Sequence, residues 1–88
     1  MEKKPEQNDE RASDRLALGR ALRELRTAAH LTQEELARRA GTDNTYISHA
    51  EAGRFGVGWD TVMRLVRAMD RTIGELAAEV ETQLDKKR

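Results

Sequence analysis

The sequence predicts an all-α fold, a compact domain of five short helices. Apolar residues recur at spacings of three and four along most of the chain, and no stretch alternates as a strand would. Residues that start and stop helices divide this pattern into five segments. With 88 residues the chain is short enough for one domain only, and it has no cysteine for a disulfide or a thiolate metal site.

The domain itself is expected between residues 13 and 84. Residues 1–12 are polar, contain the only proline and show no apolar period, so we expect a flexible N-terminal arm. Residues 85–88 form a charged tail that frays after the last apolar residue, Leu84.

The first helix is predicted over roughly residues 14–29. Ser13 or Asp14 is placed to cap its first turn, and His30 follows it where helices often end in a left-handed residue, a conformation that histidine tolerates. Four apolar residues at helical spacing form its buried face: Leu18, Leu22, Leu25 and Ala29.

The second helix, residues 33–40, has the clearest start signal in the chain. Thr32 and Glu35 have the spacing of a capping box, in which each side chain accepts a hydrogen bond from the backbone N–H of the other. The helix ends at Gly41, where a positive φ costs nothing.

The third helix, residues 44–52, follows after a connection of only about three residues. Asp43 is its N-cap candidate, and Gly53 ends it. So short a connection suits a steep crossing of the second and third helices, which is the helix-turn-helix arrangement. Three residues meet the demands of such a crossing: Ala37 at the closest approach, Gly41 in the turn and Ile47 between the helices.

Two more helices follow a loop that contains two glycines. Residues 59–69 carry an apolar stripe at positions i, i+3, i+4 and i+7. Thr72 and Glu75 then form a second capping box, which opens a fifth helix that runs through Leu84.

The stretch from Leu16 to about Leu76 resembles the lambda-repressor-like, Cro/XRE family of DNA-binding domains. The resemblance rests on LTQEELARRAG in the second helix, YIS in the third, the Glu51-x-Gly53 ending and the TIGEL start of the fifth helix, all at matching intervals. It implies that the third helix enters the major groove of double-stranded DNA.

The resemblance also implies roles for individual residues. The exposed side of the third helix would read base edges with four polar residues, namely Asn44, Thr45, Ser48 and His49. Gln33, at the start of the second helix, would hold a phosphate, and Arg54 and Phe55 would touch the DNA backbone, with help from Arg20 or Arg23. The alternative for the third-helix residues is an ordinary solvated helix face. Arg26 is expected to pair with Glu51 and lock the reading helix to the scaffold.

A homodimer on a palindromic operator is the expected assembly, because one short reading helix binds weakly alone. The fifth helix offers a stripe for it, formed by Ile73, Leu76, Ala77, Val80 and Leu84. The alternative is a frayed last turn with incidental apolar residues. The resemblance therefore implies a small transcriptional regulator, which is expected to act as a repressor.

The composition and the motifs also bear on nucleic-acid binding, catalysis, partner binding and location. The 16 Lys and Arg residues balance 16 Asp and Glu residues, so only local placement of arginine can attract a polyanion. An enzyme is not expected, since adjacent Ser48 and His49 diverge on a helix and no metal or cofactor motif is present.

The rival interpretation is an antitoxin or partner-binding regulator that uses Phe55, Val57 and Trp59. Neither a membrane span nor a secretion signal is evident, so a cytoplasmic location is expected.

Overall fold

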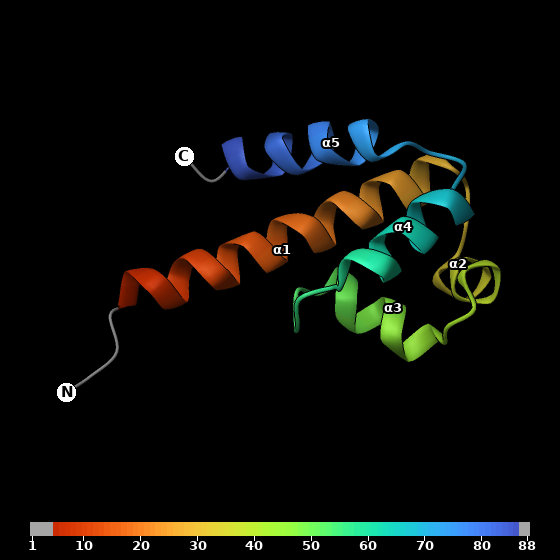
Figure 1. The fold of residues 1–88 in the computed structure, drawn as a ribbon, viewed down its shortest axis with the longest axis horizontal. Coiled ribbons are helices and arrows are strands. Elements are labelled where there is room, and N and C mark those ends of the chain that lie inside the picture. The colour runs from red at the N-terminus through yellow and green to blue at the C-terminus, as the bar shows by residue number, and fades with distance from the viewer. Residues whose placement is uncertain (1–4, 87–88) are drawn as a thin grey trace.

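The computed structural model describes the backbone of residues 5–86 and the side chains of residues 10–86. Within this range the chain forms five α-helices and no strand, as expected for the all-α class. The helices are α1 (Pro5–Ala28), α2 (Gln33–Ala40), α3 (Asn44–Glu51), α4 (Trp59–Ala68) and α5 (Ile73–Asp85). Figure 1 shows α1 through the middle of the molecule, with α5 along one side of it and α3 on the opposite side.

Helix α1 begins earlier than the sequence predicted. It starts at Pro5, so the predicted start near residue 14 is wrong: residues 5–12 are helical, and Ser13 and Asp14 lie inside the helix instead of capping it. Proline suits a first helical position because its missing N–H has no helical partner there. The residues that follow include glutamate, glutamine, arginine and alanine, which favour helix even without a packed face. Residues 1–4 of the expected arm and 87–88 of the expected tail lie outside the described residues.

The core lies between α1 and the other four helices. Helix α5 runs back along α1, and α2, α3 and α4 close the other side (Figure 1). Leu22, Leu36 and Leu65 are almost completely buried at the centre. The full cluster comprises Ala21, Leu22, Leu25, Leu31, Leu36, Ala37, Ala40, Ile47, Val62, Leu65, Val66, Met69 and Leu76. Burial of this apolar area is the main stabilising contribution to a fold that lacks disulfides.

Two helices end in left-handed residues that are not glycine. His30 has φ of 61°, which confirms the expectation for the end of α1, and Asp70 has φ of 60° after α4. At each site the next residue donates its N–H back into the last turn, from Leu31 to the carbonyl of Arg26 and from Arg71 to that of Val66. These bonds satisfy carbonyls that the helix end leaves open.

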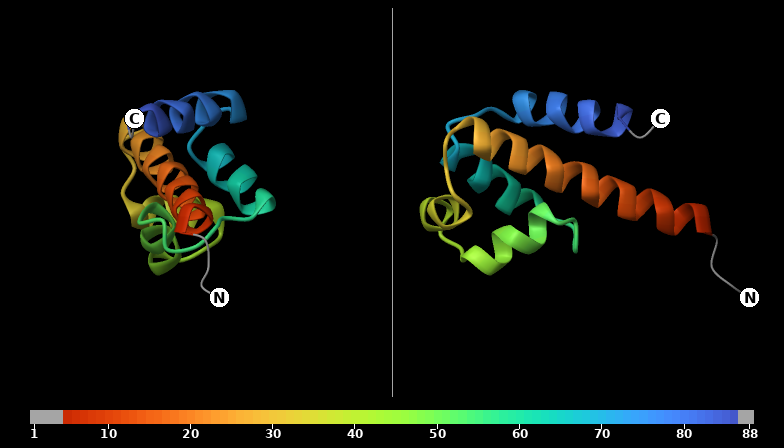
Figure 2. Two further views of the ribbon diagram at one scale, coloured as in Figure 1. Left: turned by 90° about the vertical axis from the view of Figure 1, so that its left-hand side faces the viewer. Right: turned by 180° about the vertical axis from the view of Figure 1, so that it is seen from behind.

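Helices α2 and α3 cross steeply, as the short connection predicted. In Figure 2 (right) α2 is seen end-on while α3 lies across the view. Gly41 takes φ of 73° after α2, and the Asp43 side chain accepts from the Tyr46 N–H at 2.8 Å to start α3. The turn between α2 and α3 is therefore formed by the glycine and the capping aspartate that the sequence indicated.

Candidate nucleic-acid interface

The outer side of α3 carries short polar side chains on a rigid support. Asn44, Thr45 and Ser48 are exposed, while Ile47 and Ala50 on the inner side are 1% and 2% exposed. Spacings of three and four residues place the exposed three on one face. Between positions 44 and 53 the only carboxylate belongs to Glu51, and the carboxylate of Asp43 is engaged in capping. This face therefore presents donors and acceptors with little negative charge of its own.

Helix α3 approaches α1 closely at Gly19, a contact that sequence analysis missed. A Cβ built on Gly19 would lie 2.5 Å from the carbonyl oxygens of both Ala50 and Glu51. Only glycine leaves room for the two backbones at this distance. The available signal was a glycine inside a helix, which costs about 1 kcal/mol relative to alanine and so often has a packing reason.

Arg26 and Glu51, which were expected to pair, form a two-pronged ion pair between α1 and α3. Arg26 Nε donates to Glu51 Oε2 at 2.6 Å, and Nη2 donates to Oε1 at 3.0 Å. Arg26 Nη1 donates to the Leu31 carbonyl at 2.8 Å. The two residues are 8% and 7% exposed, so the pair is buried. A bidentate geometry fixes the orientation of α3 relative to α1.

Gln33 joins this pair instead of standing free. Its Nε2 donates to Glu51 Oε1 at 2.9 Å, which ties the start of α2 to the end of α3. The side chain is half-buried, and one amide hydrogen remains for another acceptor. The sequence predicted Gln33 only as a phosphate ligand, because Glu51 lies 18 positions away along the chain.

The first turn of α2 combines open donors with acidic side chains. The first N–H groups of a helix have no partner within it, so they suit an anion. Glu34 is exposed in this turn, and Glu35 is held in the capping box. The backbone N–H of Thr32, at 2.8 Å, lowers the pKa of Glu35 from its ordinary value of 4.5.

The loop after α3 folds back onto α3 itself. Phe55 stacks at 5.0 Å between ring centroids against Tyr46, and it meets the His49 ring edge-on at 6.5 Å. Arg54 Nη1 lies 3.3 Å from His49 Nε2. Three of the expected DNA-contacting residues, His49, Arg54 and Phe55, are thus brought into one cluster. Tyr46 was not among the residues predicted for the site.

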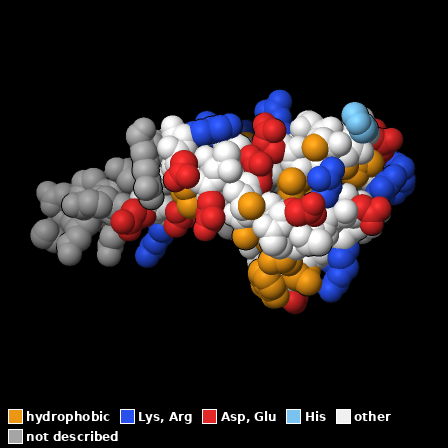
Figure 3. Space-filling view, turned by 90° about the horizontal axis from the view of Figure 1, so that it is seen from above, with side chains coloured by type: hydrophobic (Ala, Val, Ile, Leu, Met, Phe, Trp, Pro, Cys, Tyr) orange, Lys and Arg blue, Asp and Glu red, His pale blue; other side chains and the backbone are white. Residues whose placement is uncertain are grey.

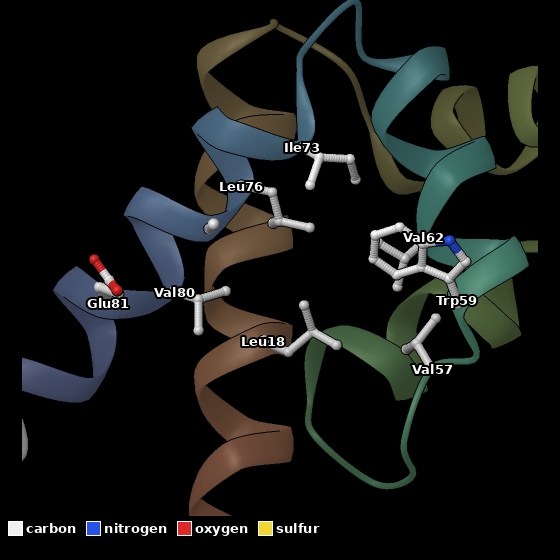
Figure 4. A pocket seen from close by; sticks show the side chains of 9 residues that line it. Leu18, Val57, Trp59, Val62, Ile73, Leu76, Val80 and Glu81 are labelled. Carbon is white, nitrogen blue, oxygen red and sulfur yellow. The ribbon is translucent and has the colours of Figure 1, made fainter.

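An apolar groove lies on the other side of α1, between α5 and the start of α4. Figure 4 shows Leu18, Val57, Trp59, Val62 and Val80 pointing toward this space. The groove has a volume of about 550 Å³, and Trp59 at its edge is 64% exposed. Of the residues expected at a dimer interface, Ile73, Leu76, Ala77 and Val80 line the groove. Leu84 is half-buried outside it.

The surface seen from the α5 side mixes charges of both signs. Figure 3 shows acidic and basic side chains interspersed there, with hydrophobic side chains gathered at one edge. No group of three potential metal-binding side chains occurs among the residues that the structure describes. In the same part of the chain, none of the helices has the length and apolar character needed to cross a bilayer.

Comparison with known proteins finds a matching family and similar solved structures. Residues 17–80 match the family described as "Helix-turn-helix domain". The restriction-modification controller protein C.AhdI from Aeromonas hydrophila is 38% identical, with a TM-score of 0.71, covering 74% of this chain and 94% of that one. The clp gene regulator ClgR from Corynebacterium glutamicum is 27% identical, with a TM-score of 0.80, covering 84% and 79%.

A third solved structure shares the fold alone. The restriction-modification controller protein C.Esp1396I has a TM-score of 0.77 at 18% identity, covering 83% of this chain and 95% of that one. The search of curated proteins returned no match. The residues matched by the family include all of α2, α3 and α4 and parts of α1 and α5.

Proposed function

The chain belongs to the helix-turn-helix domain family, and we propose that it is a sequence-specific transcriptional regulator that binds a palindromic operator as a homodimer. At the coarser level it is a helix-turn-helix DNA-binding regulator similar to a restriction-modification controller and to a gene regulator. The observation that carries the proposal is the exposed polar face of α3, held in a fixed orientation by the buried Arg26–Glu51 pair.

The chemistry of that face suits the major groove. Asn44 can pair bidentately with adenine N6 and N7, and the Thr45 methyl can contact the methyl of thymine. Ser48 donates or accepts, so it fits several base edges. All three are exposed, so they reach a groove without rearrangement of the core.

Phosphate contacts would hold the domain in register. The remaining amide hydrogen of Gln33 and the open N–H groups at the start of α2 suit one phosphate, and Arg54 suits another. Because Gln33 also bonds Glu51, it would connect the phosphate to the support of α3. Neither contact would read sequence, since phosphates are the same at every base pair.

Repression is the proposed sign of regulation. A compact domain that occupies an operator excludes other proteins from it, and this requires no activity beyond binding.

The groove beside α5 supports the proposed dimer. Trp59 and the exposed Ala77 would be covered by the same surface of a second copy, in the symmetric manner of two-fold interfaces. Two copies of α3 would then lie about 34 Å apart, one turn of DNA. Dimerisation also offsets the absence of net positive charge, because it doubles the number of base and phosphate contacts.

A partner-binding regulator, including an antitoxin, is the second candidate. It is favoured by the same groove, because an exposed tryptophan beside apolar residues is typical of a protein interface. In that case a different protein would cover Trp59, and the chain alone would remain monomeric at micromolar concentration.

Selection from random duplex DNA at two salt concentrations tests the proposal. We expect enrichment of a palindrome whose half-sites lie about 10 to 10.5 base pairs apart, with weaker binding at the higher salt. Thr27→Ala, on the exposed side of α1, is a control that should select the same sequence. Failure to enrich any sequence at either salt would overturn the proposal and favour the partner-binding candidate.

A further inference from the structure

His49 is held more tightly than the other polar residues on α3. It is half-buried, whereas Asn44, Thr45 and Ser48 are exposed. The Phe55 ring meets it edge-on at 6.5 Å with an interplanar angle of 75°, and Phe55 also contacts Tyr46 at 5.0 Å between ring centroids. These contacts restrict rotation of the imidazole.

The neighbour at Nε2 determines which imidazole nitrogen carries the proton. Arg54 Nη1 lies 3.3 Å from His49 Nε2, and a guanidinium group has donors only. A hydrogen bond between them therefore requires Nε2 to accept. In a neutral imidazole the proton is then on Nδ1, since one nitrogen donates when the other accepts. With Nε2 engaged by Arg54, Nδ1–H is the group left for another partner.

From this geometry we propose that Arg54 and Phe55 are positioning residues that fix His49 as an Nδ1–H donor, which selects an acceptor on a base edge. The inference rests on the proposed function and adds to it the base preference of one residue, His49. In the major groove, guanine presents O6 and N7, thymine presents O4 and adenine presents N7, all acceptors, whereas cytosine presents only the N4 amino donor. His49 would therefore accept guanine, thymine or adenine and disfavour cytosine at the base it contacts.

This assignment changes the expected role of Arg54. One of its N–H groups is directed to His49, and the others remain for a phosphate. Loss of Arg54 would then have two effects, a uniform loss of affinity and a loss of discrimination at one base. A residue that only contacts phosphate would cause the first effect alone.

Nitrogen-15 NMR of the two histidine rings in the free protein tests the tautomer without DNA. At about pH 8, we expect the His49 proton on Nδ1. In Arg54→Ala we expect His49 to shift toward the Nε2–H form that free imidazole side chains favour. His30, the only other histidine, is exposed and should not change. An Nε2–H form in the wild type, or the same tautomer in Arg54→Ala, would overturn the proposal.

Base preference on the selected operator tests the consequence. We expect His49→Ala and Arg54→Ala to lose selectivity at the same base position, by roughly ten-fold, the value of a good base contact. Arg67→Ala, which removes an exposed arginine from α4, is the matched control and should leave that selectivity intact. Unchanged selectivity in Arg54→Ala would overturn the positioning role even if the operator is bound. If no operator is bound, the proposed function fails, and the NMR result still decides the tautomer.

Discussion

At the scale of single residues, the orientation of α3 is fixed by side chains that hydrogen-bond between helices. Arg26, Glu51 and Gln33 form one hydrogen-bonded set that joins α1, α2 and α3. Each of the three residues comes from a different helix, so together they fix the orientation of the three helices relative to one another. Replacement of a member should therefore affect stability and recognition together.

Replacing Arg26 by alanine should be strongly destabilising. It leaves the buried Glu51 carboxylate without its cation, and removal of one member of a buried pair costs about 3 to 5 kcal/mol. Urea unfolding measures the change. Arg23→Ala removes an exposed arginine from the same helix and should change stability by less than about 0.5 kcal/mol.

The double variant Arg26→Met with Glu51→Leu separates charge burial from packing. It removes both charges and should recover much of the stability that Arg26→Ala loses. A single variant that unfolds at the same urea concentration as the wild type would contradict the role of the pair.

Replacing Gly19 by alanine tests the close approach of α1 and α3. The added methyl group would lie 2.5 Å from two carbonyl oxygens, so the helices must separate. We expect a loss of at least 1 to 3 kcal/mol, the usual range for overpacking. Gly74→Ala is the control, because its nearest neighbour would lie at an ordinary 3.8 Å and alanine favours helix. A Gly19→Ala protein as stable as the wild type would contradict the packing.

At the scale of elements, the helices were predictable where local chemistry defines their ends. The capping boxes at Thr32 and Thr72 and the left-handed turn at Gly41 are formed by residues within four positions of each other. The start of α1 was missed because Ser13 and Asp14 are acceptable inside a helix as well as before one. A residue that is acceptable both before a helix and inside it cannot show where that helix begins.

The site was predictable only in part, for the same reason. Periodicity within eight residues placed Asn44, Thr45 and Ser48 on the outer face of α3. The bond from Gln33 to Glu51 and the approach of Gly19 to Ala50 depend on how separate helices pack. No spacing along the chain encodes those distances.

The capping box of α2 should make stability depend on pH. The folded pKa of Glu35 is lowered below 4.5, so its ionised form adds stability above that value. The contribution is lost as the pH falls through the lowered folded pKa. We expect Glu35→Gln to be less stable than the wild type at neutral pH, with the difference shrinking in acid.

Thermal unfolding at a series of pH values measures this effect. Glu34→Gln removes a charge from the same turn without removing a capping bond, so it is the matched control. A stability difference for Glu35→Gln that stays constant from neutral to acidic pH would contradict the argument.

At the scale of the whole molecule, the proposed dimer would place two copies of α3 on one operator. Ala77 is exposed and lines the apolar groove, whereas Ala78 is exposed and does not line it. We expect Ala77→Glu to dissociate the dimer and Ala78→Glu to leave it intact, since only the first places a charge in the interface. Sedimentation velocity at micromolar concentration distinguishes them.

A second variant addresses the last turns of α5. Val80→Glu combined with Leu84→Glu should also give a monomer, and circular dichroism checks that α5 remains folded. A wild type that is monomeric at micromolar concentration, or an Ala77→Glu protein that stays dimeric, would show that this groove is not the interface.

The central claim is that the outer face of α3 reads bases, and affinity for two DNA duplexes tests it most directly. Asn44→Ala and Thr45→Ala are compared with the wild type on the selected operator and on a scrambled duplex of equal length, at one salt concentration. If these side chains contact bases, each substitution should cost about 1 to 3 kcal/mol on the operator and little on the scrambled duplex. Gln33→Ala should weaken both duplexes alike, as a phosphate contact does. Equal losses on the two duplexes for Asn44→Ala and Thr45→Ala would contradict the claim.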